Sequence, residues 1–222
     1  MGGMHVDDLS ARTQDYLKAL WGWAEHSQEP APLGEIARRT GQKNSTASEA
    51  IKRLAADGLV SHEPYAGVRL TGQGHRLAGQ MVRRHRLVET FLVTELDYAW
   101  DEVHDEAEQL EHAVSDRFIA RIDARLGHPA RDPHGDPIPR PDGSVEEVSN
   151  LALADVSSGA VTVERVNDDD PELLRYLAER GVGPGTKVSV TAPAAAGILT
   201  VEVGGDVVAL AESCLHDIKV SR

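Results

Sequence analysis

Hydrophobic and polar positions recur with a helical period over the first part of the chain. Apolar side chains between Leu9 and His26 lie three and four residues apart, which predicts a helix that the prolines of "SQEPAP" end. A short helix is predicted in "LGEIARRTGQ", and a third runs from the cap candidates Asn44 and Ser45 to Asp57. The pattern therefore predicts a long helix followed by two helices that are joined by a short turn.

The pattern changes twice in the middle of the chain. The segment "LVSHEPYAGVRLT" is typical of a β-hairpin that turns around residues 65–67. Two further helices are predicted, from Gly72 to about Leu96 and from about Trp100 to Leu126. The next segment, "GHPARDPHGDPIPRPDGS", holds five of the eleven prolines and cannot be regular structure.

Short β-rich segments separated by turns follow Val145. They are "GAVTVERVN", "TKVSVTAP", "GILTVEVGG", "DVVALAE" and "HDIKVSR", and one helical piece, "PELLRYLAERG", interrupts them. This pattern predicts a small β-barrel of about 75 residues. The predicted fold class is therefore mainly α with an α+β tail.

Composition removes several classes of protein. With 222 residues, 41% hydrophobic and 27% charged, the chain is typical of a globular protein of one to three domains. No apolar run reaches the roughly 18–20 residues of a membrane span, and the first residues lack the pattern of a secretory signal. Cys214 is the single cysteine, which excludes an internal disulfide and a cysteine-rich zinc site. We expect a cytoplasmic protein without a membrane partner.

Charge is distributed unevenly along the chain. The formal net charge is −13, which alone argues against nucleic-acid binding. The stretch from Ala31 to Thr90, however, has ten Lys and Arg against five Asp and Glu, a local net charge of +5. All other residues together carry −18. A basic N-terminal module is thus joined to an acidic body.

Helix, turn, helix and hairpin in this basic stretch are the layout of a winged helix-turn-helix. The second helix is expected in the DNA major groove, where small hydroxyls and a lysine suit phosphate contacts and close approach to bases. Tyr65 and Arg69 of the hairpin are expected along the DNA backbone or minor groove. The alternative is a helical packing unit without DNA function. The predicted DNA-contacting residues are Arg39, Lys43, Ser45, Thr46, Ser48, Glu49, Lys52 and Arg69.

The segment "HDEAEQLEH" holds two imidazoles and four carboxylates. On a helix, His104, Glu108, Glu111 and His112 share one face because they are three or four residues apart. Such a stripe is either a solvated acidic face or part of a metal site. Spacing alone leaves both open.

The preceding helix carries a second pair at helical spacing, His85 and Glu89. Carboxylates and imidazoles that converge from antiparallel helices are a common way to build a metal site in a helical assembly. In isolation such a pair is more often a surface interaction. The remaining histidines have no such company and are predicted to be surface or structural residues: His5, His26, His62, His75, His128, His134 and His216.

The segments "RHRLVETFL", "VHDEAEQLEHAVSD" and "HGDPIP" strongly resemble the diphtheria-toxin-repressor family of metal-dependent transcriptional repressors. The resemblance covers the first 140 residues well and the C-terminal part more loosely. It implies a winged helix-turn-helix over residues 1–74 and a helical metal-binding and dimerisation domain over 75–145. An SH3-like barrel, also seen in ferrous-iron-transport accessory (FeoA-like) proteins, is implied over 146–222.

The resemblance also implies the ligands of two metal sites. The ancillary site of the family matches His85, Glu89 and His104, and the primary site matches Asp15, Glu108, Glu111 and His112. Iron-responsive members have methionine and cysteine at the places of Asp15 and Glu108, whereas manganese-responsive members have aspartate and glutamate. Carboxylate oxygens suit manganese, and soft thiolates suit later metals. The resemblance therefore implies Mn²⁺, with Fe²⁺ or Co²⁺ as possible substitutes.

The chain departs from the family pattern at several places. Lys18 stands where one manganese-responsive branch has a glutamate, so the two-metal geometry of that branch is not carried over. Glu49 replaces a glutamine of the recognition helix, which changes the expected operator. Iron-type members lend the ancillary site a glutamate and a glutamine from the barrel; here Glu164, Asn167 or Asp168 is the candidate.

The expected function is a homodimeric, manganese-dependent repressor of manganese-homeostasis genes. Metal is expected to fix the spacing of two recognition helices on a palindromic operator. No catalytic residue is predicted. Three alternatives stay open: an iron(II)-dependent repressor of the same family, a metallohydrolase that activates water at a His/carboxylate site, and a winged-helix regulator of organic ligands. The last is disfavoured because only 4% of residues are aromatic.

Overall fold

The computed structural model describes residues 4–63 and 66–222, and the chain divides into two compact units. The first unit consists of Met1–His85 and Pro139–Ser144, and the second consists of Arg86–Ile138 and Val145–Arg222. Among the described residues, no helix is both long enough and apolar enough to cross a membrane.

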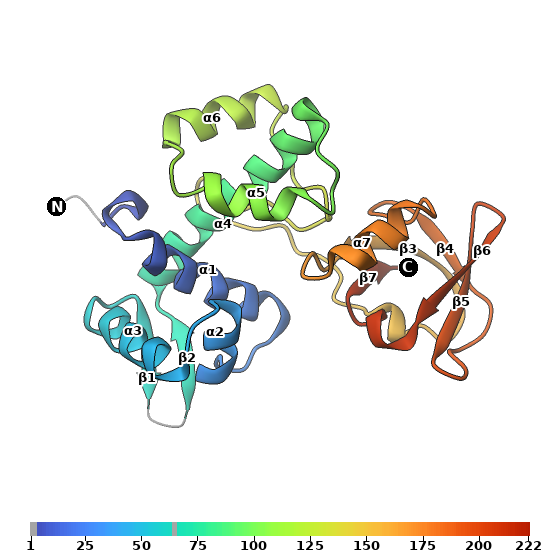
Figure 1. The fold of residues 1–222 in the computed structure, drawn as a ribbon, viewed down its shortest axis with the longest axis horizontal. Coiled ribbons are helices and arrows are strands. Elements are labelled where there is room, and N and C mark those ends of the chain that lie inside the picture. Colours follow the sequence, from blue (N-terminus) through green and yellow to red (C-terminus); the bar gives the residue numbers. More distant parts are fainter. Residues whose placement is uncertain (1–3, 64–65) are drawn as a thin grey trace. The chain divides into compact units, whose positions relative to one another are not determined.

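The first unit contains the predicted helix-turn-helix and hairpin (Figure 1). Its elements are η1 (Val6–Asp8), α1 (Ala11–His26), α2 (Leu33–Arg39), α3 (Asn44–Ala56), β1 (Val60–Glu63) and β2 (Gly67–Leu70). Leu17, Ile36 and Ile51 lie on the apolar stripes of the three α-helices and are almost fully buried. The predicted winged helix is confirmed in this unit, while Tyr65 lies outside the described residues.

The hairpin leads directly into the long helix α4 (Gly72–Leu96), which continues from the first unit into the second. β1 and β2 are antiparallel, with Ser61 opposite Arg69. A Cβ atom at Gly74 would lie 1.9 Å from the carbonyl oxygen of Leu59. Only glycine therefore allows the start of α4 to approach β1 this closely.

The helical part of the second unit differs from the prediction. A single helix from Trp100 to Leu126 is wrong, because the structure has α5 (Val103–Leu110) and α6 (Asp116–Arg125) with a turn between them. The Ser115 hydroxyl accepts a hydrogen bond from the Phe118 amide and begins α6. The stripe from His104 to His112 is therefore not one helix face, since its last two members follow the end of α5.

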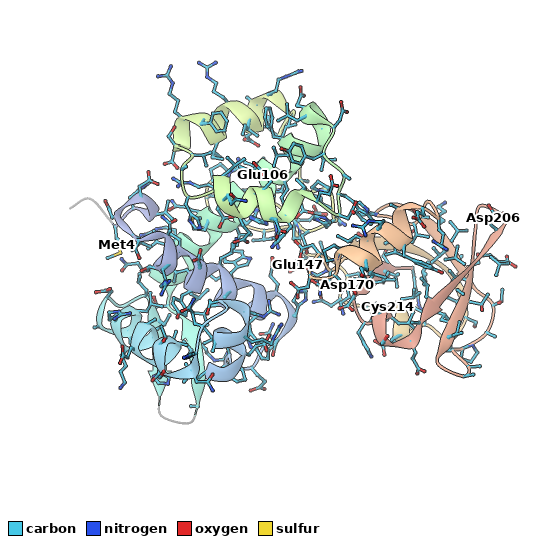
Figure 2. The ribbon with its side chains drawn as sticks, viewed as in Figure 1. Met4, Glu106, Glu147, Asp170, Asp206 and Cys214 are labelled. Atoms are coloured by element: carbon cyan, nitrogen blue, oxygen red, sulfur yellow. The ribbon has the colours of Figure 1, made fainter. Side chains whose placement is uncertain are left out.

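The C-terminal part of the second unit is a five-stranded antiparallel sheet in the order β6-β5-β4-β3-β7. Its strands are β3 (Gly159–Val166), β4 (Lys187–Val190), β5 (Ile198–Val203), β6 (Asp206–Ala211) and β7 (Ile218–Ser221), with the short 3-10 turns η2 (Leu153–Asp155) and η3 (Glu212–Cys214). Asp170 begins α7 (Pro171–Ala178), because its carboxylate accepts hydrogen bonds from the amides of Glu172 and Leu173 (Figure 2). Leu174 and Leu177 of α7 join the core of the sheet. This part, residues 151–222, is called the C-terminal sheet domain below and confirms the predicted β-rich tail.

Candidate metal centre and nucleic-acid interface

The residues predicted to contact DNA lie in the first unit, on α2, α3 and β2. Arg39 ends α2, Lys43 precedes the first turn of α3, and Arg69 lies in β2. All of the predicted DNA-contacting residues are exposed or half-buried, whereas Ala47 and Ile51 of α3 are buried. The predicted DNA-contacting side chains, which point away from the core of this helix-turn-helix, are thus hydroxyls, cations and the carboxylate of Glu49.

Glu35 orients two arginines at the end of α2. Its carboxylate accepts hydrogen bonds of 2.8 Å from Arg38 Nη2 and from Arg39 Nε. The hydrogen bond from Arg38, together with that from Arg39, outweighs burial and lowers the pKa of Glu35 to about 2. Glu35 is therefore ionised at neutral pH and holds Arg39 in a fixed direction.

Three predicted metal ligands meet in the second unit: Glu89 of α4, His104 of α5 and Asp168, which follows β3. His104 Nδ1 lies 2.9 Å from Asp168 Oδ2 and 3.4 Å from Glu89 Oε1. The other ring nitrogen, Nε2, lies 3.5 Å from Glu108 Oε1. The side chain of Glu89 is only 1% exposed, and a buried carboxylate requires a positive partner.

The imidazole of His104 is that positive partner. Burial lowers the pKa of His104, but the hydrogen bonds to Asp168 and Glu89 outweigh burial and raise the pKa to about 11. Burial likewise raises the pKa of Asp168, but the hydrogen bond to His104 prevails and lowers it to about 2. At neutral pH His104 is therefore an imidazolium that lies between carboxylates. A metal ion that binds this ring would take the place of its proton.

Asp132 and His134 form a second buried group with Glu89, which the sequence prediction missed. One ligand atom from each of these three residues lies within 4.8 Å of the other two. His134 is fully buried and Asp132 nearly so, so of the two predicted roles for His134, surface or structural, burial excludes the surface one. Burial and the nearby carboxylates of Asp136 and Glu89 raise the pKa of Asp132. The available signal was a histidine between aspartates in "DPHGDP".

His134 is oriented as metal-ligating histidines are. Its Nε2 lies 2.7 Å from the Trp100 carbonyl oxygen, and Nε2 must be the donor because a carbonyl oxygen only accepts. In the neutral ring Nδ1 then keeps its lone pair. His134 Nδ1 is buried without a hydrogen-bond partner among the described residues. A ring that donates one N–H to a backbone carbonyl and offers its other nitrogen fits a divalent cation.

Only one of the three ligand candidates in the C-terminal sheet domain joins these groups. Asp168 contacts His104, whereas Glu164 forms an ion pair with Arg131 and accepts a hydrogen bond from Ser221. The Asn167 amide donates to carboxylates beyond the strand end. Of Glu164, Asn167 and Asp168, which the sequence left open, Asp168 is the one that lies beside His104; its role as a ligand stays a prediction.

The ligands predicted for the primary site are divided between the two units. Glu108 lies on α5, and Glu111 and His112 follow in the turn after it, with Glu111 Oε1 3.6 Å from His112 Nε2. Glu111 is fully buried. Asp15 lies on α1 in the first unit, so its joining to the other three stays a prediction.

His85 of the predicted ancillary site lies at the end of the first unit. It is one helical turn before Glu89 on α4, as predicted from their spacing. Within the first unit, Lys18 Nζ lies 3.4 Å from His85 Nδ1. The participation of His85 in a site with His104 stays a prediction.

A helix-turn-helix with a polar, partly basic face and buried groups of imidazoles and carboxylates define a metal-dependent DNA-binding protein. Three family models match successive parts of the chain. They are the iron dependent repressor N-terminal DNA-binding domain over residues 8–68, the iron dependent repressor metal-binding and dimerisation domain over 71–140, and the FeoA domain over 151–222. The chain belongs to the diphtheria-toxin-repressor family of metal-dependent repressors.

Relatives of known name match the chain over almost its whole length. The iron-dependent repressor IdeR of Mycobacterium leprae is 30% identical and is matched over 98% of this chain and 100% of its own length. A solved manganese-dependent transcriptional repressor in complex with manganese is 48% identical, with a TM-score of 0.89 over 94% of this chain and 99% of that one. The manganese regulator SloR is 32% identical, with a TM-score of 0.80 over 96% of this chain and 100% of its own.

These relatives are transcriptional repressors and not enzymes, which removes the metallohydrolase alternative. The protein is a metal-dependent DNA-binding repressor whose cofactor is a divalent metal ion. Its matched domains indicate DNA and a second copy of the chain as partners.

Proposed function

We propose that the activating metal is Mn²⁺ and that the loaded homodimer represses manganese-homeostasis genes from a palindromic operator in the cytoplasm. The observation that supports this most is a donor set without sulfur. Glu89, His104, Asp132, His134 and Asp168 offer only carboxylate oxygens and imidazole nitrogens, and Asp15 and Glu108 add carboxylates. Such donors suit manganese, whereas thiolate or thioether donors would favour softer metals.

The chain's own residues divide into two tasks. Those gathered in the second unit hold a cation and keep the end of α4, α5 and the start of the C-terminal sheet domain together. Glu108, Glu111 and His112 are proposed to bind a further cation together with Asp15 of α1, the helix that precedes the helix-turn-helix. A bound divalent cation supplies the positive charge that these carboxylates otherwise lack.

Joining Asp15 to the second unit would fix the DNA-binding unit and thereby the spacing of the two α3 helices in a dimer. Metal then shifts a population toward the operator-binding state, by as much as its affinity differs between the two states. The half-sites of a palindromic operator must match this spacing.

An iron(II) sensor is the second candidate, because relatives such as IdeR of Mycobacterium leprae are named iron-dependent repressors. The two candidates differ in the residues at positions 15 and 108. The solved structures named after manganese, including the one that is 48% identical, favour the first candidate.

The double variant Asp15→Met, Glu108→Cys tests this choice. Binding to DNA upstream of a manganese-uptake gene is measured by gel shift with manganese, iron(II), cobalt or zinc, and with chelator. The wild type should bind best with manganese, and the variant should require more manganese and respond better to iron(II), since its donors are softer. Asp105→Asn, an exposed carboxylate on α5, is the matched control and should behave as the wild type.

Two results would contradict the proposal. An unchanged metal preference in the double variant would remove Asp15 and Glu108 as the selecting ligands. Equal protection of the operator with manganese and with chelator, in a footprint of the wild type, would remove metal as the activator.

A further inference from the structure

The loop of residues 131–137 is a tight turn built on the side chain of Asp132. Asp132 Oδ1 accepts hydrogen bonds of 2.9 Å from the amides of His134 and Asp136. The Asp132 amide donates to the Asp136 carbonyl over 3.0 Å. The same turn that presents Asp132 and His134 to Glu89 therefore depends on where Asp136 is held.

The C-terminal sheet domain approaches this loop without a gap. The amide of Val166 in β3 donates to the His134 carbonyl over 2.9 Å. Gly135 has a φ of +92°, and a Cβ atom there would lie 2.0 Å from the Glu164 carbonyl oxygen. Glycine thus allows the loop to lie directly against the backbone of β3.

Arg165 of β3 joins the C-terminal sheet domain to Asp136 through its side chain. Its guanidinium is 3% exposed and donates from Nη1 to Asp136 Oδ1 over 3.0 Å and from Nη2 to Asn150 Oδ1 over 2.6 Å. A planar guanidinium fixes two acceptors in one geometry, which a single ammonium group does not.

Arg86 of α4 faces the same loop. Its Nη1 donates to the Pro137 carbonyl over 2.8 Å, its Nε lies 3.5 Å from Asp132 Oδ2, and its Nη2 lies 3.9 Å from Asp136 Oδ1. Arg86 therefore holds the loop to the helix that carries Glu89, while Arg165 holds it to the sheet. The two carboxylates of the turn lie between two buried cations.

We propose that Arg165 is a positioning residue through which the C-terminal sheet domain sets the metal affinity of the group Glu89, Asp132 and His134. The inference rests on the proposed metal function and assigns the sheet domain a role beyond its ligand Asp168. Without Arg165, Asp136 loses its nearest cation and repels Asp132, so the turn relaxes. His134 and Asp132 then no longer lie in the right place beside Glu89, although no ligand has been removed.

The test compares Arg165→Met and Arg165→Lys with the wild type in the full-length protein. Manganese binding is measured by calorimetry and electron paramagnetic resonance, and cobalt(II) absorption reports the coordination geometry. Loss of a residue that orients ligands weakens metal affinity by roughly 10–100-fold. We expect Arg165→Met to lose manganese affinity by this factor at one site and to change the cobalt spectrum. Arg165→Lys should lose less affinity, because lysine keeps the charge but lacks the planar pair of donors.

Arg175→Gln is the matched control. Arg175 of α7 pairs with Asp101 over 3.0 Å and so also joins the sheet domain to the helical part, at a place away from the 131–137 loop. This control should keep wild-type affinity and the wild-type cobalt spectrum. A general loosening of the sheet domain would instead affect Arg175→Gln as well, which would overturn a specific role for Arg165.

Glu89→Gln separates the inference from the proposed function. If Glu89→Gln loses manganese while Arg165→Met and Arg165→Lys bind as the wild type does, the inference is wrong and the metal function stands. If the wild type binds no manganese, or Glu89→Gln binds as the wild type does, the metal group itself is wrong and the inference falls with it.

Discussion

His104 faces carboxylates from both ring nitrogens, Nδ1 toward Asp168 and Glu89 and Nε2 toward Glu108. These partners overcome burial and raise its pKa to about 11, so the ring is an imidazolium in the metal-free protein. A cation that binds the ring must displace a proton. The apparent manganese affinity should therefore rise with pH across the neutral range, by about tenfold per pH unit for one released proton.

Calorimetric titrations at several pH values, in buffers of different ionisation enthalpy, measure both the slope and the proton release. His104→Gln should abolish the proton-linked part. His128→Gln is the control, because His128 pairs with Asp123 at a largely exposed position. An affinity that does not change with pH would show that His104 is not a ligand.

The residue scale also shows what spacing alone can predict. His85 with Glu89 and His104 with Glu108 are helical neighbours, so their pairing is visible in the sequence. The nearness of His134 to Glu89 was not predicted, because Glu89 lies far away in the sequence and because the burial of His134 depends on the folded loop. Asp168 was one of three candidates in one short segment. Glu164 lies within β3 and Asp168 follows the end of that strand, a difference that the sequence did not reveal.

Helix capping explains why the single helix predicted from Trp100 to Leu126 is two helices, α5 and α6, in the structure. The residues from Trp100 to Leu126 keep a helical period, but Ser115 caps α6 and the chain turns after Leu110. A serine followed by an aspartate is a recognised signal for the start of a helix. Here it starts a new helix although the hydrophobic spacing continues without a break. The consequence is functional, since Glu111 and His112 lie in a turn instead of on a rigid helix face.

Helix α3 allows a test of the nucleic-acid interface. Lys52 is exposed on α3, and each phosphate that a lysine neutralises adds about 0.9 to the steepness with which affinity falls with salt. Lys52→Ala should therefore weaken binding to operator and unrelated DNA alike and reduce the salt slope by about 1.

Fluorescence anisotropy with labelled DNA at several salt concentrations measures this slope. Arg117→Ala, an exposed cation of α6, is the control and should leave the slope unchanged. If Lys52→Ala altered the preferred sequence and kept the slope, Lys52 would contact a base edge and not a phosphate.

At the scale of the whole molecule, the order of the elements was predictable, while the predicted division into three domains stays a prediction. Hydrophobic period and turn residues gave the helix-turn-helix, the long helix and the β-rich tail. Family models match three ranges, whereas the chain forms two compact units. Within the second unit, the 131–137 loop packs closely on β3 at Gly135 and buried Arg165, and this packing has no periodic signal in the sequence.

The proposed metal groups around Glu89 predict that the stability of the second unit depends on metal. The groups around Glu89 draw ligands from α4, α5, the 131–137 loop and the end of β3, so a cation bound there holds the folded arrangement and not the unfolded chain. A ligand present at one hundred times its dissociation constant stabilises the folded state by about 2.7 kcal/mol. Manganese should therefore raise the unfolding temperature in a concentration-dependent way, and chelator should reverse the rise.

Differential scanning calorimetry of the full-length protein, with and without manganese, measures this effect. Glu89→Gln should lose most of the stabilisation, because Glu89 belongs to both buried groups. Glu95→Gln, which removes a carboxylate of α4 that pairs with Arg125, should keep it. A manganese effect of equal size in both variants would mean that the cation stabilises the fold elsewhere and that Glu89 is not a ligand.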